Sequence, residues 1–145
     1  QAHYQSAVCL ALSGNVDSAI VVCDELLKIY SGYSKAHNLK GLILFDKKKY
    51  PDAVFCFNQA IRYDSRLIEG YFYRAKSYYE MKNYNSAIQD LDKVVSYNSQ
   101  FSEAYYYLGL CKIGQGEKEQ GLAALKKAQE LGFQFPANKL SELPD

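Results

Sequence analysis

Apolar residues recur along this chain with the spacing of an α-helix. Ala53, Phe57 and Ala60, for example, lie three or four residues apart and form one stripe. No segment alternates apolar and polar residues with the period of two that is typical of a strand. Short polar segments containing Gly, Asn or Lys separate the stripes, and such segments favour tight reversals in solvent. The pattern predicts an all-α protein with helices over 2–13, 17–30, 35–47, 51–63, 69–81, 85–97, 103–115 and 118–131.

Small residues return along the chain with a 34-residue period. One column comprises Ala19, Ala53, Ala87 and Gly121. A second column lies twelve residues upstream and comprises Ala7, Gly41, Ala75 and Gly109. Two columns at a constant offset indicate two helices that approach closely in every unit, which is the signature of a helix-turn-helix solenoid. The predicted units are 1–33, 34–67, 68–101 and 102–135, with 136–145 as a short C-terminal tail or capping turn.

The columns resemble the tetratricopeptide repeat, whose pattern is W-x2-L-G-x2-Y followed by A-x3-F. In the third unit the matching residues are Tyr71, Arg74, Ala75 and Tyr78, then Ala87, Leu91 and Val94. The resemblance covers essentially the whole chain. It implies a right-handed superhelical solenoid of about four tetratricopeptide helix-turn-helix repeats.

Two columns depart from the family pattern. The Leu column holds Ser6, Lys40 and Arg74 in the first three units, so we expect it to be only half buried. The closing Pro is replaced by serines, which we expect to cap the following helices. These serines are Ser31, Ser65 and Ser99.

Charge and hydropathy exclude several classes of partner. The 17 basic and 16 acidic residues are interspersed and give a net charge of +1, so we expect no nucleic-acid partner and no anionic-membrane footprint. No apolar run approaches the roughly 20 residues needed to cross a bilayer, so we expect no membrane insertion. The chain opens with Gln1 rather than Met and shows no signal-peptide pattern, so we expect it to be part of a longer protein.

Residues that carry chemistry are few. The four Cys form no metal-ligand spacing, and Cys23 and Cys56 fall on apolar faces, so buried free thiols and a reducing compartment such as the cytoplasm are favoured. His3 and His37 occupy one repeat column in which the family prefers an aromatic residue, so we interpret both as packing residues. No Ser-His-Asp or Cys-His catalytic arrangement can be built without one of these two histidines. The sequence therefore predicts no enzyme activity, no metal and no cofactor.

The resemblance implies that the first helices of the units line a concave groove that binds an extended peptide. The runs 71–73 and 105–107 are entirely aromatic, and neighbours on a helix point about 100° apart, so some of these rings must face the groove or a neighbouring unit. Sealing the seams between units is the alternative role for each ring. The candidate groove residues are Tyr4, Asn38, Leu42, Phe72, Tyr73, Lys76, Tyr106, Tyr107 and Leu110. We expect Phe72, Tyr73, Lys76, Tyr106 and Tyr107 to form the energetic centre, with Lys76 as an exposed cation.

Chaperone adaptors of the family hold a partner's C-terminal carboxylates with paired Lys, Asn and Arg side chains. The matching positions here hold Tyr4, Val8, Leu39, Glu69 and Tyr73. We therefore expect no binding of acidic chaperone tails.

Together these patterns predict a protein-interaction module that binds a peptide segment or a helix in an aromatic-rich concave groove. Two alternatives stay open. In the first alternative, the chain is an accessory domain of a larger enzyme or transport machine. In the second, it is a structural unit that self-associates through the ends of the solenoid.

Overall fold

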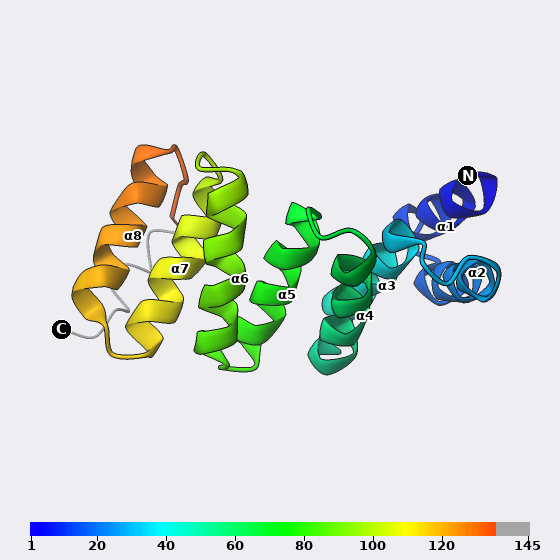
Figure 1. Cartoon of the computed structure of the whole chain (residues 1–145), viewed down its shortest axis with the longest axis horizontal. Helices are drawn as coiled ribbons and strands as arrows, with labels where there is room; N and C mark the ends of the chain where they lie inside the picture. Colours follow the sequence, from blue (N-terminus) through cyan, green and yellow to red (C-terminus); the bar gives the residue numbers. More distant parts are fainter. Residues whose placement is uncertain (136–145) are drawn as a thin grey trace.

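The computed structural model describes residues 1–135, and these form eight helices and no strand (Figure 1). The helices are α1 (Ala2–Leu12), α2 (Val16–Ile29), α3 (Ser34–Asp46), α4 (Tyr50–Tyr63), α5 (Ile68–Glu80), α6 (Tyr84–Tyr97), α7 (Ser102–Gly114) and α8 (Lys118–Glu130). Every helix begins and ends within one residue of its predicted range, and the all-α prediction is confirmed. The predicted tail at 136–145 lies outside the described residues.

The helices pack as consecutive antiparallel pairs. α1 packs on α2, α3 on α4, α5 on α6 and α7 on α8, and each second helix also packs on the first helix of the next unit. In Figure 1 the pairs follow one another along the long axis, with α1 and α2 at one end and α7 and α8 at the other. The repeat solenoid predicted from the 34-residue period is therefore confirmed.

Small residues lie where the paired helices touch. Ala19, Ala53 and Ala87 are fully buried. A Cβ built on Gly41 would lie 2.7 Å from Cε1 of Phe57, which leaves no room for a larger side chain on α3. The two columns therefore set how closely the helices of each unit approach.

The turn within each unit uses one left-handed residue at a fixed place in the repeat. Gly14, Lys48, Lys82 and Gly116 occupy this place in the four units, with φ of 85°, 57°, 58° and 87°. Gly132 follows α8 with φ of 90°, as expected for the residue that ends that helix.

The turns between units differ from the expectation that serines cap the next helix. Helices α3, α5 and α7 begin after Tyr33, Leu67 and Phe101, and none of these junctions has a side-chain cap. In the later junctions the residue before the serine forms the turn instead. The Asp64 Oδ1 accepts a hydrogen bond from the Arg66 N–H at 3.1 Å, and Asn98 does the same for Gln100 at 3.0 Å.

The column in which the family has Leu holds Lys40 and Arg74 in the second and third units, and both are half buried there, as predicted. They are half buried because these cations bind residues of the second helices. In the first unit the member of this column is exposed. The Lys40 Nζ donates to Asp24 at 2.6 Å. The Arg74 guanidinium donates to both carboxylate oxygens of Asp90, at 2.7 and 2.6 Å, and a third bond at 2.6 Å reaches Asn58. These bonds tie α3 to α2, and α5 to both α4 and α6.

Three of the four thiols are buried. Cys23, Cys56 and Cys111 lie in the core, whereas Cys9 is exposed, and none forms a disulfide. Burial raises the pKa of Cys23 and Cys56 to about 11 and that of Cys111 to about 12. These thiols therefore behave as small apolar side chains, as predicted for Cys23 and Cys56.

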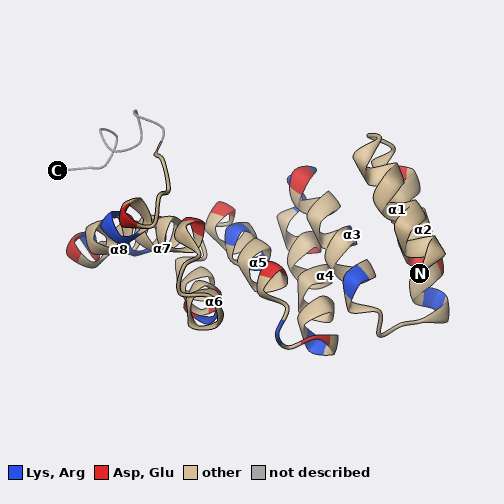
Figure 2. Ribbon diagram, turned by 90° about the horizontal axis from the view of Figure 1, so that it is seen from above, with Lys and Arg blue, Asp and Glu red and all other residues tan. Residues whose placement is uncertain are grey.

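Charges of both signs are distributed along the solenoid, as Figure 2 shows for the whole length of the ribbon. Within residues 1–135 no helix is both long and apolar enough to cross a membrane.

Candidate peptide-binding surface

Two of the predicted groove residues are buried between units. Phe72 and Tyr106 expose 2% and 6% of their surface. The Phe72 ring lies 4.7 Å from the Phe101 ring, and Tyr106 lies 5.3 Å from Phe135, which is the equivalent of Phe101 in the next unit. Each ring thus fills the junction in front of the next unit. This corrects the expectation that Phe72 and Tyr106 contact a partner directly, since sealing the seams is their role.

The same packing explains two further candidates. Tyr4 is half buried and meets the Tyr33 ring edge-on at 5.5 Å, which is the first member of the same series of seams. Asn38 occupies the second seam and is 6% exposed. Its Nδ2 donates to Glu69 Oε2 at 2.6 Å, so it links α3 to α5 rather than projecting as an isolated donor.

The remaining candidates lie on the partly exposed side of α3, α5 and α7. We call this the first-helix surface, and it comprises Leu39, Leu42, Phe45, Tyr73, Lys76, Tyr107 and Leu110, none of them fully buried. Tyr73 packs on Phe45 and Phe57 with ring centroids 5.6 and 6.3 Å apart, while Tyr107 packs on Tyr79 at 5.5 Å. Both tyrosines are therefore held in place by other rings while part of each stays accessible.

Lys76 is enclosed by four aromatic rings, which we call the aromatic box. Its Nζ lies 5.4 Å from the Phe45 centroid, 5.3 Å from Phe72, 5.0 Å from Tyr73 and 5.2 Å from Tyr107. The lysine side chain is only 16% exposed. This corrects the expectation of an exposed lone cation, because ring faces attract an ammonium at this range.

Carboxylates surround the accessible tyrosines. Glu103 Oε1 lies 3.5 Å from the Lys76 Nζ. Burial raises the pKa of the Tyr73 phenol, and the negative charges of Glu103, Glu69 and Asp46 raise it further. The pKa of Tyr107 is also raised, by burial first and then by Glu103, Tyr106 and Glu80. The first-helix surface is therefore aromatic with an acidic border.

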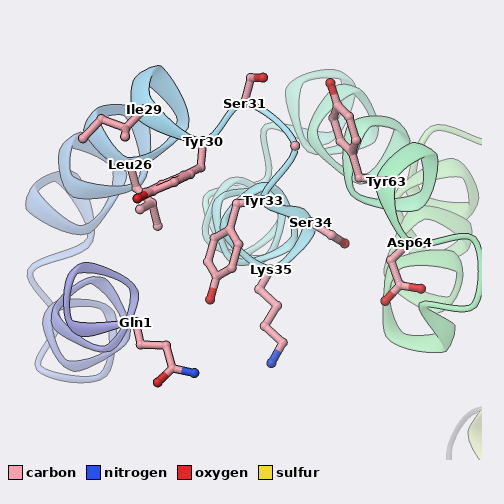
Figure 3. Close-up of a pocket in the computed structure, with 11 residues that line it drawn as sticks. Gln1, Leu26, Ile29, Tyr30, Ser31, Tyr33, Ser34, Lys35, Tyr63 and Asp64 are labelled. Atoms are coloured by element: carbon pink, nitrogen blue, oxygen red, sulfur yellow. The ribbon is translucent and has the colours of Figure 1, made fainter.

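A pocket of about 930 Å³ lies between the first two units (Figure 3). Gln1 borders it from α1, the end of α2 supplies Leu26 and Ile29, and the end of α4 supplies Tyr63. The remaining lining residues are Tyr30, Ser31, Gly32, Tyr33, Ser34, Lys35 and Asp64. This pocket was not predicted from the sequence. The feature that could have indicated it is the pair Ile29 and Tyr63, which occupy one repeat column at the ends of the second helices and are 68% and 47% exposed.

The two histidines differ in their surroundings. His37 stacks on Tyr63 at 5.8 Å, and its Nε2 lies 2.9 Å from the Ser31 carbonyl oxygen, so its predicted packing role is confirmed. His3 is exposed, which corrects the same expectation for that residue. Residues 1–135 hold no group of three His, Cys, Asp or Glu side chains placed to bind a metal.

Comparison with known structures identifies the fold. MamA from Desulfovibrio magneticus RS-1 aligns with a TM-score of 0.82 at 21% identity, covering 89% of this chain and 73% of that structure. YrrB, described as a tetratricopeptide-repeat protein with an unusual peptide-binding site, aligns with a TM-score of 0.83 at 19% identity, covering 90% of this chain and 67% of that one.

The relatives by sequence are much longer than this chain. Superkiller complex protein 3 of Homo sapiens is 32% identical over 66 residues, which is 46% of this chain and 4% of that protein. Its counterpart in Mus musculus is 31% identical over 75 residues, or 52% of this chain and 5% of that protein.

A family model settles the assignment. The model for anaphase-promoting complex, cyclosome, subunit 3 matches residues 46–128, which is more than half of the chain. Repeats of this kind form protein-interaction modules whose stacked units present an extended surface. The chain is therefore a tetratricopeptide-repeat protein, and it belongs to the family of anaphase-promoting complex subunit 3.

Proposed function

We propose that this protein binds a peptide segment or a helix of another protein on its first-helix surface, which forms the groove expected from the repeat family. The observation that carries the proposal is the placement of Tyr73 and Tyr107. Both rings are fixed by neighbouring aromatic side chains, yet both remain partly accessible. Rigid tyrosines of this kind provide a large contact area and lose little side-chain entropy on binding.

Apolar neighbours extend the surface on both sides of these rings. Leu42 on α3 and Leu110 on α7 are partly exposed at equivalent places in their units. An extended segment lying across α3, α5 and α7 would contact both leucines and the two tyrosines. In this proposal Phe72 and Tyr106 support the surface from beneath, and the protein acts by binding rather than by catalysis.

Selection of displayed peptides tests the proposal without a known partner. Random peptides of about 12 residues span about 40 Å when extended, enough to cross several helices. We expect selected peptides to bind the protein in solution, and Tyr73→Ala or Tyr107→Ala to weaken them at least about thirtyfold, as for a buried aromatic anchor.

The matched control is Phe55→Ala on α4, because this ring is 63% exposed and lies outside the first-helix surface. It should leave the affinity unchanged. All variants must keep the helical circular-dichroism signal of the parent, and binding is measured well below the melting temperature of each variant. Peptides that bind folded Tyr73→Ala and Tyr107→Ala as tightly as the parent would place the partner elsewhere.

Self-association is the second candidate function, and the exposure of α1 favours it. Ala2 and Cys9 are exposed on α1, whereas their counterparts one repeat later, Ala36 and Ile43, are 0% and 4% exposed beneath the preceding helix pair. A helix from a second copy, or from a segment of the protein that precedes Gln1, could cover this side of α1. Sedimentation velocity over a range of concentrations tests this, and a single monomeric species throughout would exclude it.

A further inference from the structure

We propose that the segment bound by the first-helix surface is basic, with lysine or arginine side chains that contact Tyr73 and Tyr107 and pair with the carboxylates beside them. This inference rests on the proposed function and specifies the chemistry of the partner.

The charges of the first helices divide into two groups. Lys40, Arg74 and Lys112 pair with acidic residues of the second helices or the turns. The other charged residues of α3, α5 and α7 are Lys35, Asp46, Glu69, Lys76, Glu80 and Glu103. These are four acids and two bases, so they carry a formal excess of two negative charges. Because Lys76 pairs with Glu103, the excess consists of Asp46, Glu69 and Glu80 against Lys35.

The acidic residues lie at the ends of the helices that carry the first-helix surface. Glu69 and Glu103 are the second residues of α5 and α7, and Asp46 and Glu80 are the last residues of α3 and α5. Glu69, Asp46 and Glu103 act on the Tyr73 phenol, whose raised pKa reflects their charge in addition to burial. Glu80 and Glu103 act on Tyr107 in the same way. A cation placed against either ring would thus lie within the field of several carboxylates.

The carboxylates on this side can accept hydrogen bonds from a partner, whereas Asn38 is buried in its seam and bonds to Glu69. Carboxylate oxygens only accept. Ammonium and guanidinium groups are donors without acceptors, so they complement this set of oxygens.

The aromatic box shows that rings of this surface hold an ammonium group. Lys76 Nζ lies within 5.4 Å of all four centroids and 3.5 Å from Glu103. Tyr73 and Tyr107 belong to the box and are also partly exposed. Lys76 already occupies these ring faces and pairs with Glu103, so a cation from a partner would pair with the carboxylates that Lys76 leaves free, which are Asp46, Glu69 and Glu80. An acidic segment would instead meet carboxylates of its own sign.

The peptide selection also tests this inference when its products are read by charge. We expect lysine and arginine to be enriched among peptides whose binding depends on Tyr73. Synthetic versions in which citrulline replaces arginine, and acetyl-lysine replaces lysine, should bind at least about tenfold more weakly because the cation is lost while its shape is retained. The affinity should also fall as salt concentration rises.

On the protein side, Glu69→Gln combined with Glu80→Gln should weaken the basic peptides at least about tenfold and reduce their salt dependence. The glutamine introduced at position 69 retains an oxygen for the Asn38 amide, and Glu80 is exposed, so the fold is preserved. Glu25→Gln on α2, which removes one exposed carboxylate elsewhere, should have no effect.

The outcomes separate the two proposals. Neutral or acidic peptides whose binding depends on Tyr73 would overturn the basic partner and leave the binding surface intact. Basic peptides that bind the Glu69/Glu80 variant as tightly as the parent would also overturn it. Failure to select any peptide sensitive to Tyr73→Ala or Tyr107→Ala would overturn both proposals.

Discussion

Gly109 on α7 and Gly121 on α8 bring the two backbones of the fourth unit into contact. A Cβ built on either glycine would lie 2.8 Å from the carbonyl oxygen of the other. Leu125 Cγ would lie 2.6 Å from the Cβ at position 109, so the site is closed from a second direction as well. The fourth unit therefore requires glycine where the preceding unit uses Ala75 and Ala87.

Gly109→Ala is expected to destabilise the protein by up to about 2 kcal/mol, because overpacking typically costs about 1–3 kcal/mol and the higher helix propensity of Ala returns about 1 kcal/mol of this. In a helix interior without steric overlap the same substitution would stabilise by about 1 kcal/mol. Urea unfolding, monitored by circular dichroism, measures the sign of the change in the free energy of unfolding. Ala123→Gly, at an exposed position of α8, calibrates the propensity effect alone. A stabilised Gly109→Ala variant would contradict the close approach.

The left-handed turn residues provide a second prediction. Lys82 has φ of 58°, and the equivalent Gly116 has φ of 87° with no atom within 4 Å of a built Cβ. Because left-handed backbone costs an L-residue about 1–2 kcal/mol, Gly116→Ala should destabilise by about 1 kcal/mol. Lys82→Gly should stabilise by up to about 1 kcal/mol. Thermal melts of the two variants check this, and a loss of stability in both would argue against the conformation of the turn.

The Arg74–Asp90 pair ties α5 to α6 through two hydrogen bonds, and its side chains are 18% and 7% exposed. Asp90→Ala should cost about 3–5 kcal/mol, because it leaves the Arg74 charge partly buried and unpaired. Replacing both residues at once, as Arg74→Met with Asp90→Leu, should restore most of that loss. Denaturant unfolding of Arg74→Met, of Asp90→Leu and of the double variant provides the complete cycle. Equal losses in Asp90→Ala and the double variant would show that the pair is not a coupled unit.

Thiol reactivity should distinguish Cys9 from the other three cysteines. The thiolate is the reactive form, and burial raises the pKa of Cys23, Cys56 and Cys111 to between about 11 and about 12. At about pH 8 a disulfide reagent should therefore modify one thiol rapidly in the native protein and all four after denaturation. Cys9→Ser should remove the rapid phase. A rapid phase that persists in this variant would show that a core thiol is accessible.

Peptides that end in an acidic chaperone-type tail should not bind. The positions that would supply cations and amides hold Tyr4, Val8, Leu39, Glu69 and Tyr73, and Glu69 adds negative charge. A carboxylate without charge-assisted partners stays in water. Titration by calorimetry should show no saturation at low micromolar concentrations. Saturable binding that is lost when the peptide terminus is amidated would contradict this.

The helices could be predicted from sequence because two independent signals agree. The helical period places the apolar stripes, and the 34-residue period places the small residues at the contacts between helices. Positions such as Ala53 and Gly121 satisfy both, which is why every boundary falls within one residue of the structure.

The candidate site was harder to predict because helical periodicity does not distinguish which of two adjacent aromatic residues faces the partner and which is buried. Phe72 and Tyr73 are adjacent, and either could face outward. What buries Phe72 is the Phe101 ring at the junction with the next unit, and that contact depends on the angle at which consecutive units stack. The enclosure of Lys76 has the same origin, since its box combines rings from α3, α5 and α7.

The aromatic box also bears on how the protein unfolds. In most solenoids a unit interacts only with its immediate neighbours, so the array behaves as a chain of locally coupled segments. The Lys76 ammonium of the third unit lies 5.4 Å from the Phe45 centroid in the second unit and 5.2 Å from the Tyr107 centroid in the fourth. Loss of any one of these units removes part of the cation's surroundings. The box therefore strengthens both nearest-neighbour interfaces of the third unit at once, so the second and the fourth units each depend on the third for part of their coupling to the array.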